Sequence, residues 1–263
     1  MIMNRLEYKY LVPIDLLPDL RKEIKPFVEP DPYVLKTGLG HYTVHSIYFD
    51  TPDLKYYYDK VEGIDIRKKV RLRSYNQPDE TSLLFLEIKE KNQKTIRKRR
   101  LILNWSENPL VPHQKHILLT RDSSRSAKNG WHELPFFMNL IYQDALRPVV
   151  QISYDREAYF HRFNRTLRLT FDYHLRSMLQ PEISEFFVER GTIISLPRHF
   201  IWEVKFFGGL PSWLLAIIAT FQLQQQALSK YNICLEKHLI RERVKSKIVL
   251  ANRNYLKNYL LRV

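Results

Sequence analysis

The feature that most constrains the fold of this chain is the alternation of apolar and charged residues in several short segments. In "IWEVKFF", residues 201–207, a strand would place Glu203 and Lys205 on one face and three large apolar side chains on the other. The same Glu-x-Lys spacing recurs as Glu7 and Lys9 in "LEYKY" and as Glu87 and Lys89 in "LFLEIKEK". Three such charged faces require a common explanation.

Other segments show the same period of two residues. Arg71 and Arg73 share the charged face of "VRLRSY", and Arg168 and Asp172 share that of "LRLTFDY". Each strand taken alone fits an ordinary antiparallel sheet with one solvated face. Taken together, and with enough helices to cover the apolar faces, the strands also fit a closed barrel whose charged faces point inward.

The chain is predicted to form one α+β domain over residues 1–263. Its hydrophobic content of 44% is enough to bury a full core. Strand patterns dominate, and a first helix is expected over 15–28, interrupted by Pro18. The pattern over about 109–146 is helical and predicts a helical insertion. A basic amphipathic helix is expected over about 232–263.

Charge and cysteine content limit the function and the compartment. The formal net charge is +14, which favours polyanionic partners such as nucleic acid, acidic lipid or phosphorylated molecules. The single cysteine, Cys234, excludes an intrachain disulfide and fits a reducing cytosol. No apolar stretch reaches the roughly 20 residues that span a bilayer, and the N-terminus is charged too early for a signal peptide. A cytoplasmic protein without a transmembrane segment is therefore expected.

If the strands enclose a lumen, its lining is strongly basic. Buried like charges are costly unless they are paired, so such a lumen must hold an anion. The predicted lining residues are Arg5, Lys9, Arg71, Arg73, Lys89, Arg97, Arg99, Arg156, Lys205 and Lys230.

A spaced set of motifs extends from about residue 4 to about residue 235: "RLEYKY", "KVRLRSY", "LEIKEK", "IRKRR", "YDREAY", "WEVKF" and "LSKYN". The set resembles the VTC-type polyphosphate polymerase domain of the CYTH-like triphosphate tunnel metalloenzyme superfamily. The resemblance implies an eight-stranded antiparallel β-barrel tunnel with a charged lumen, flanked by helices. It also implies that a divalent cation assists transfer of the γ-phosphate of ATP, or another nucleoside triphosphate, onto a growing polyphosphate chain.

The resemblance further implies roles for individual residues. The implied catalytic residues are Lys9, Arg71, Arg73, Lys89 and Arg156. The implied phosphate-binding residues are Arg5, Arg97, Arg99, Tyr154, Lys205, Ser229 and Lys230. Arg97 stands where relatives carry a lysine, which keeps the charge but changes the hydrogen-bond geometry. At Ala227 the chain lacks a lysine that some eukaryotic relatives have.

These residue types suit phosphate chemistry. Guanidinium groups bind phosphate oxygens in bidentate fashion, and lysines act as point charges. Mg²⁺ and Mn²⁺ are hard cations that favour carboxylate and phosphate oxygens, with Glu203 the first expected ligand and Glu7 the second. On a strand, Glu-x-Lys places the two groups about 6–7 Å apart, so metal and phosphate would lie side by side.

Two other functions fit the sequence. A triphosphatase of the same superfamily, acting on inorganic triphosphate or an RNA 5′ end, would use the same residues, and no sequence feature separates hydrolysis from transfer. A non-enzymatic nucleic-acid or polyanion binder fits the net charge, but the arginines alternate with core residues, so no nucleic-acid partner is expected. The expected partners are ATP or another nucleoside triphosphate and inorganic polyphosphate. Because eukaryotic relatives belong to membrane complexes, a membrane-protein partner stays open.

Overall fold

The computed structural model describes residues 5–79, 82–93, 95–105, 110–113, 116–119 and 133–243. Its main element is a ten-stranded antiparallel sheet with the order β1-β12-β10-β9-β3-β4-β5-β6, to which β11 and β2 add by pairing with β10 and β9. The strands are β1 (Leu6–Pro13), β2 (Val28–Pro30), β3 (Tyr42–Asp50), β4 (Ile66–Tyr75), β5 (Leu83–Asn92), β6 (Thr95–Asn104), β9 (Arg147–His161), β10 (Arg168–Leu179), β11 (Ile193–Ile194) and β12 (His199–Phe206).

The helices lie at intervals along the chain. α1 (Leu17–Ile24) follows a short 3-10 turn, and Pro18 lies in its first turn. A proline at this position loses no helical hydrogen bond, so Pro18 helps to start the helix and the predicted interruption is wrong. The other helices are α2 (Pro32–Thr37), α3 (Lys55–Val61), α4 (Leu134–Gln143), α5 (Ser212–Thr220) and a last helix over 230–243. None of the helices among the described residues has the length and apolar character needed to cross a membrane.

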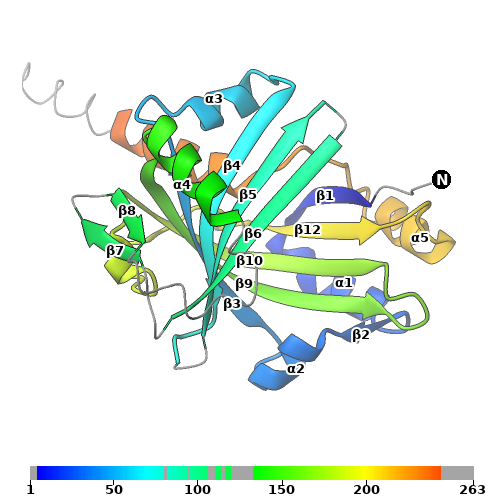
Figure 1. Cartoon of the computed structure of the whole chain (residues 1–263). Helices are drawn as coiled ribbons and strands as arrows, with labels where there is room; N and C mark the ends of the chain where they lie inside the picture. The colour runs from blue at the N-terminus through cyan, green and yellow to red at the C-terminus, as the bar shows by residue number, and fades with distance from the viewer. Residues whose placement is uncertain are drawn as a thin grey trace, which may run out of the picture.

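Two hydrophobic clusters cover the convex face of the sheet, and they involve the helices α1, α4 and α5 (Figure 1). α4 contributes Phe137 to a cluster with Leu72 of β4 and Leu84 of β5. α1 and α5 contribute Leu20 and Leu214 to a second cluster, which covers β1, β10 and β12. On β1, β4, β5, β10 and β12 the apolar faces are thus covered by helices, and the charged faces are turned to the opposite, concave side.

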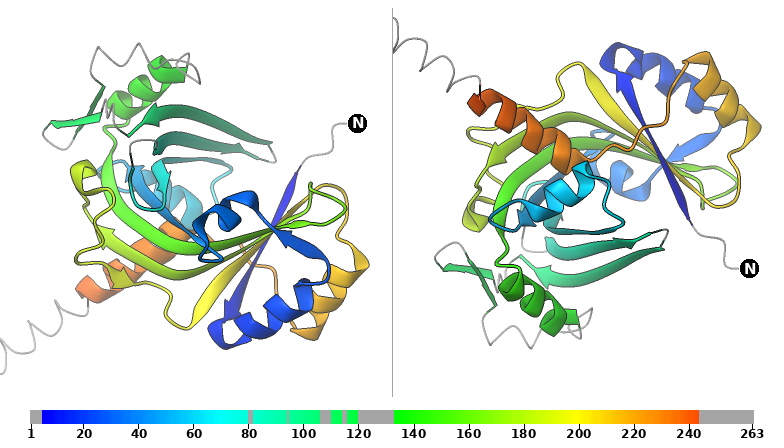
Figure 2. Two further views of the ribbon diagram at one scale, coloured as in Figure 1. Left: turned by 90° about the horizontal axis from the view of Figure 1, so that it is seen from below. Right: turned by 90° about the horizontal axis from the view of Figure 1, so that it is seen from above.

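A third cluster occupies one end of the concave face. The last helix contributes Tyr231, Cys234 and Leu235, which pack with Tyr48 of β3 and Ile152 of β9. Figure 2 shows this helix in orange, lying across the concave side of the sheet next to α3. This end of the concave face is therefore apolar and closed by the helix, which leaves the remaining part to the charged residues.

The sheet curls strongly, but hydrogen bonds do not close it (Figure 2). Within the part of the chain that the structure describes, β1 and β6 end the strand order and no ladder joins them. The outer edge of β1 meets the segment before the last helix, through a bridge between Tyr10 and Gln225 and a 2.8 Å hydrogen bond from the Gln226 amide to the Lys9 carbonyl. The predicted α+β class with a tunnel-like antiparallel sheet is confirmed, whereas the sheet is curled rather than closed.

The region 109–146 differs from the predicted helical insertion. Strands β7 (Leu110–His113) and β8 (His116–Leu119) form an antiparallel hairpin, so the helical prediction for this segment is wrong. A short apolar run such as "HILL" fits a strand as well as a helix, and periodicity alone does not separate them. The helix predicted after it is confirmed as α4. Residues 120–132, and 244–263 of the predicted C-terminal helix, lie outside the described residues.

Candidate functional site

The concave face carries the charged residues expected from the alternation. On β12, Trp202 and Val204 are buried in a convex cluster, while Glu203 and Lys205 lie on the concave face. β1 extends this face, because Lys9 is the ladder partner of Glu203. The ladder registers place these charged residues on the concave face: Arg5, Glu7, Lys9, Lys69, Arg71, Arg73, Glu87, Lys89, Lys98, Arg100, Arg156, Arg168, Asp172, Glu203 and Lys205.

Glu203 lies at the centre of this charge network. Its carboxylate accepts hydrogen bonds from Lys205 Nζ at 2.8 Å and from Lys230 Nζ at 2.9 Å. Lys9 Nζ lies at 3.7 Å and Arg156 Nη2 at 3.8 Å. Burial alone would raise the pKa of Glu203, but the surrounding cations, led by Lys205, hold it well below the ordinary value of 4.5. Glu203 is therefore an ionised carboxylate whose oxygens are shared among several cations.

Asp172 is the second buried carboxylate of the site. Arg156 donates from Nε and Nη2 to the two oxygens of Asp172 at 2.5 and 2.6 Å, and Lys230 Nζ lies 2.5 Å from Oδ2. Burial opposes ionisation, yet Arg156 and then Lys230 outweigh it and lower the pKa of Asp172. The ring of Tyr154 lies 4.8 Å from Lys230 Nζ and 5.3 Å from the Arg156 guanidinium carbon. Strands β9 and β10 and the last helix thus meet in one compact ionic group.

Glu87 of β5 is held by cations on a separate wall. Arg71 Nε and Arg100 Nε each donate to it at 2.8 Å, and Lys98 Nζ lies at 2.6 Å. Burial would raise the pKa of Glu87, but these neighbours, Arg71 first among them, hold it far below the ordinary value of 4.5. Three cations around one carboxylate leave this wall with excess positive charge.

β6 presents its basic residues differently from the prediction. Lys98 and Arg100 are the residues that share the concave face, whereas Arg97 and Arg99 lie on the convex face. There Arg99 forms an ion pair with Glu133, and Arg97 is exposed. The predicted placement of Arg97 and Arg99 in the lumen is therefore wrong by one residue, because neighbouring side chains on a strand point to opposite faces.

The other predicted residues gather on the concave face with different degrees of exposure. Arg5 and Lys89 are exposed. Ser229 lies at the start of the last helix, where its hydroxyl accepts a hydrogen bond from Lys69 Nζ at 2.7 Å. Lys69 was not predicted, although it lies two residues before Arg71 and the alternation places it on the same face. The structure brings together Lys9, Arg71, Arg73, Arg156, Lys205 and Lys230, with Tyr154 and Glu203 among them.

Arg73 differs from the other buried cations because it has only neutral partners. Only 7% of the surface of Arg73 is exposed. Its Nε donates a hydrogen bond to Ser46 Oγ at 3.2 Å, and its Nη2 donates one to the Tyr154 hydroxyl at 3.3 Å. Among the described residues, no carboxylate oxygen lies within 4.0 Å of its guanidinium nitrogens. Arg73 and Glu87 act on each other only beyond contact distance, because Arg73 helps to lower the pKa of Glu87 after Arg71. A buried guanidinium without a carboxylate in contact is costly, so this position favours an anion from outside the chain.

Electrostatic coupling shows that the walls of the curled sheet face each other. Burial, and then Lys9 of β1, lowers the pKa of Lys69 on β4 to about 7. Burial would raise the pKa of Glu7 on β1, but Lys9 first, then Lys205, and also Lys89 of β5 lower it. β1 ends the strand order, and β4 and β5 lie toward its other end, so these side chains approach one another across the concave face. We call the charge-lined concave side of the curled sheet, between these facing walls, the tunnel.

The two carboxylates predicted to bind a metal are neighbours in the tunnel. Lys9 Nζ lies between them, 2.9 Å from Glu7 Oε1 and 3.7 Å from Glu203 Oε1. The described residues contain no group of three or more His, Cys, Asp or Glu side chains suited to a metal ion. Two carboxylates supply fewer than the roughly six oxygens that Mg²⁺ prefers. The donor set therefore fits a cation that arrives with phosphate oxygens, and it does not fit one held by protein ligands alone.

Comparison with solved structures identifies similar chains at low sequence identity. The PH1819 protein from Pyrococcus horikoshii OT3 is 12% identical with a TM-score of 0.46, covering 89% of this chain and 99% of its own. A putative adenylate cyclase (bh2851) from Bacillus halodurans is 13% identical with a TM-score of 0.47, covering 86% and 94%. The putative adenylyl cyclase HpAC1 from Hippeastrum, described as having a dominant triphosphatase activity, is 12% identical with a TM-score of 0.48, covering 88% and 94%.

Among curated proteins, no match was found. The family comparison is decisive, because the model of the VTC domain matches residues 4–239, which is most of the chain and includes every charged strand of the tunnel. The chain belongs to the VTC domain family.

Proposed function

We propose that this protein is a polyphosphate polymerase, which transfers the γ-phosphate of ATP or another nucleoside triphosphate to a growing inorganic polyphosphate chain. The observation that carries the proposal is Arg73, a buried guanidinium with only neutral partners on the wall of a basic tunnel. Membership of the VTC domain family supports the same chemistry. A string of phosphates suits a space in which cations project from several strands.

Arginines and lysines divide the work of binding. Arg71 and Arg73, two residues apart on β4, offer planar forks that bind phosphate oxygens in bidentate fashion. Lys230 and Lys205 add compact charges from the last helix and from β12. Arg73 does not have to break an ion pair before it binds a phosphate. Its interaction with an incoming phosphate is therefore opposed least among these groups.

Phosphoryl transfer requires in-line positioning and neutralisation of charge on the equatorial and leaving oxygens, with little covalent work for the protein. The tunnel cations supply both. Glu203 and Glu7 would hold Mn²⁺ or Mg²⁺ together with phosphate oxygens, with Lys9 and Lys205 as the neighbouring phosphate partners. When bound, the cation supplies further neutralisation of phosphate charge.

Transfer and hydrolysis differ in their need for a proton acceptor. A hydrolase must activate water with a base, whereas a phosphate terminus is already ionised and needs none. Glu203, Asp172 and Glu87 are each bound by cations that lower their pKa values, so these carboxylates are weak proton acceptors. The triphosphatase is the second candidate, and the products formed from ATP separate the two activities.

Incubation of the full chain with ATP and Mn²⁺, followed by gel analysis of polyphosphate and chromatography of nucleotides, tests the proposal. Long-chain polyphosphate together with ADP is the expected result. Orthophosphate without polymer would establish the triphosphatase instead. Absence of turnover with each of ATP, GTP and tripolyphosphate, combined with tight RNA binding, would leave a nucleic-acid binder and refute both enzymatic functions.

A further inference from the structure

Lys69 of β4 is a tunnel residue to which neither the motifs nor the ion-pair networks assign a role. It is half-buried, and its Nζ donates a hydrogen bond to Ser229 Oγ at 2.7 Å. Among the described residues, no carboxylate oxygen lies within 4.0 Å of this ammonium. The buried carboxylates Glu203, Asp172 and Glu87 are bound by other cations. Lys69 therefore has no ion pair to offset its charge, unlike Lys9, Lys205 and Lys230.

The surroundings of Lys69 are themselves basic. The charged groups that face it are Lys9 of β1, Lys89 of β5, Lys60 of α3 and Arg71 of its own strand. Lys9 among these cations is paired with Glu7, and the cations from four elements together create a positive potential at Lys69. Such a position is costly when empty and is stabilised by a bound anion.

Ser229 completes the polar part of this position. It caps the last helix: its carbonyl accepts from the Ile233 amide at 3.0 Å, and its hydroxyl accepts from the Asn232 amide at 3.4 Å. The hydroxyl oxygen therefore receives hydrogen bonds from both Lys69 and Asn232, and its own proton has no recorded acceptor among the described residues. Ser229 can donate that proton to a phosphate oxygen, at a helix end where the dipole favours negative charge.

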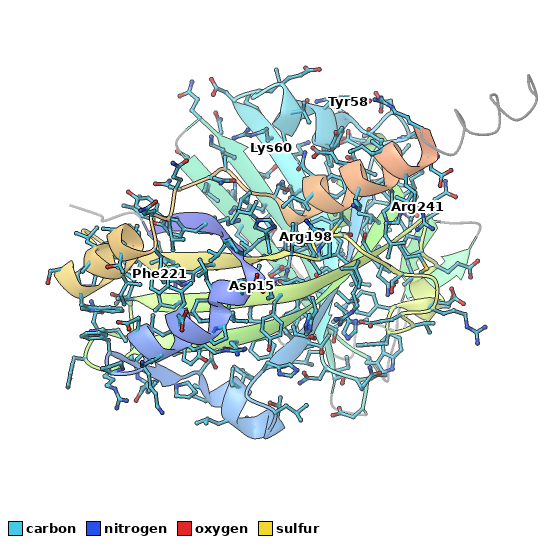
Figure 3. All side chains as sticks on the ribbon, turned by 180° about the vertical axis from the view of Figure 1, so that it is seen from behind. Asp15, Tyr58, Lys60, Arg198, Phe221 and Arg241 are labelled. Carbon is cyan, nitrogen blue, oxygen red and sulfur yellow. The ribbon has the colours of Figure 1, made fainter. Side chains whose placement is uncertain are left out.

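A cavity adjoins the same position. It measures about 260 Å³, and Lys60, Ala227, Ser229 and Asn232 are among its lining residues. Lys60, labelled in Figure 3, comes from α3, so the cavity lies between α3 and the start of the last helix. Lys60 and Glu236 contribute one charge of each sign to the lining, and the volume has room for a phosphoryl group that extends beyond the central tunnel.

We propose that Lys69 and Ser229 form a distinct phosphate subsite at the α3 end of the tunnel, which binds a phosphoryl group of the condensed-phosphate chain. The subsite rests on the proposed function, because it extends the same tunnel. Lys69 approaches the phosphate as a point charge, and the Ser229 hydroxyl orients one oxygen. The subsite therefore adds affinity for chains long enough to reach it.

Phosphate binding at this subsite is coupled to the uptake of a proton. With the tunnel empty, burial and the neighbouring lysines hold the pKa of Lys69 at about 7. A phosphate next to the amine favours its charged form and raises that pKa. Binding above pH 7 then takes up a proton, so the contribution of Lys69 to affinity is full below pH 7 and declines as pH rises above it.

Calorimetric titration of inorganic tripolyphosphate into the full chain at pH 8, in two buffers of different ionisation enthalpy, tests the subsite. Wild type is expected to bind with net proton uptake. Lys69→Met should weaken binding about 10- to 100-fold, as for loss of a hydrogen bond to a charged group, and should reduce the proton uptake. Lys68→Met is the matched control, because Lys68 is the adjacent residue on the convex face and pairs with Asp144.

The outcomes separate the subsite from the tunnel. Equal affinity and equal proton uptake in wild type and Lys69→Met would overturn the subsite. If Arg73→Ala then lost binding, the proposed phosphate binding in the tunnel would still stand. Failure of wild type to bind tripolyphosphate would refute both. Folding is monitored by the melting temperature without anion, which should stay constant or rise in Lys69→Met because a repelled charge is removed. A Ser229→Ala variant should show weaker binding with the proton uptake retained, and unchanged binding there would remove Ser229 from the subsite.

Discussion

Arg156 and Asp172 form a bidentate ion pair between adjacent strands, with N–O distances of 2.5 and 2.6 Å. They are direct partners in the ladder of β9 and β10, and both are buried. Lys230 joins the pair from the last helix at 2.5 Å. The pair therefore serves the fold as well as the tunnel, so loss of activity in an Arg156 variant would not by itself identify a ligand contact.

Asp172→Asn should destabilise the protein by about 3–5 kcal/mol, because it leaves buried Arg156 and Lys230 without one counter-ion. Urea denaturation monitored by tryptophan fluorescence measures the change. Added tripolyphosphate should stabilise this variant more than wild type, since an anion can take the vacated place. Equal stability of the two proteins would show that the ionic group contributes nothing to folding.

Acid should destabilise wild type through the same group. The folded-state pKa values of Glu203 and Asp172 lie below the ordinary values of 4.5 and 3.8. The stabilisation is therefore fully present above about pH 4.5 and is lost as pH falls through the lower folded-state values. Melting temperatures between pH 6 and pH 3 should fall for wild type and fall less for Asp172→Asn. Parallel curves would contradict the assignment.

Arg73→Ala should slow polyphosphate synthesis and weaken tripolyphosphate binding about 10- to 100-fold, in line with hydrogen bonds to charged groups. The melting temperature without anion should change little, because Arg73 leaves no carboxylate unpaired. Arg73→Lys keeps the charge but loses the planar fork, and an intermediate activity is expected. Full activity of Arg73→Ala would remove the observation on which the proposed function rests.

Lys98→Ala should weaken tripolyphosphate binding severalfold, whereas Arg97→Ala should leave it unchanged. The two residues are neighbours on β6, and only Lys98 shares the concave face with Glu87. Titration in parallel at one salt concentration makes the comparison direct, because both variants lose one positive charge. The reverse pattern would place Arg97 in the tunnel and the ladder register of β6 in error.

Glu203→Gln should raise the Mn²⁺ concentration needed for half-maximal activity by at least about 10-fold, since even outer partners of metal ligands cost 10- to 100-fold. Glu90→Gln is the control, because Glu90 lies on the convex face of β5 near Arg99. A Mn²⁺ titration of both variants checks this. Superimposable curves for Glu203→Gln and wild type would exclude Glu203 as a ligand.

The sequence predicted the strand faces wherever charged and apolar residues alternate cleanly. On β4 and β12 only one assignment of residues to the two faces buries the apolar side chains. The structure places Arg71, Arg73, Glu203 and Lys205 on the expected concave side. The reason is physical, since only one register buries the apolar side chains of each strand. The curl of the sheet did not follow from that pattern alone, which also fits an open sheet; the tunnel-like fold was implied by the family resemblance.

The errors arose where the local pattern does not show which residues belong to which face of the strand. In "RKRR" every position is basic, so alternation within the run cannot decide which residues face inward. The buried leucines that follow carry the missing signal: Leu101 and Leu103 lie two and four residues after Arg99, which puts Arg99 on the apolar face. Ion pairing across strands, which brings Lys230 to Asp172, depends on tertiary contacts that no local pattern contains.

The missing ladder between β1 and β6 affects how the tunnel can be loaded. In a closed barrel, parting any two strands breaks backbone hydrogen bonds, so a polymer must be threaded end-first. Within the described chain, the two terminal strands of this sheet share no such bonds and can separate without that loss. Under the proposed function, a polyphosphate already long at both ends would not have to be threaded end-first.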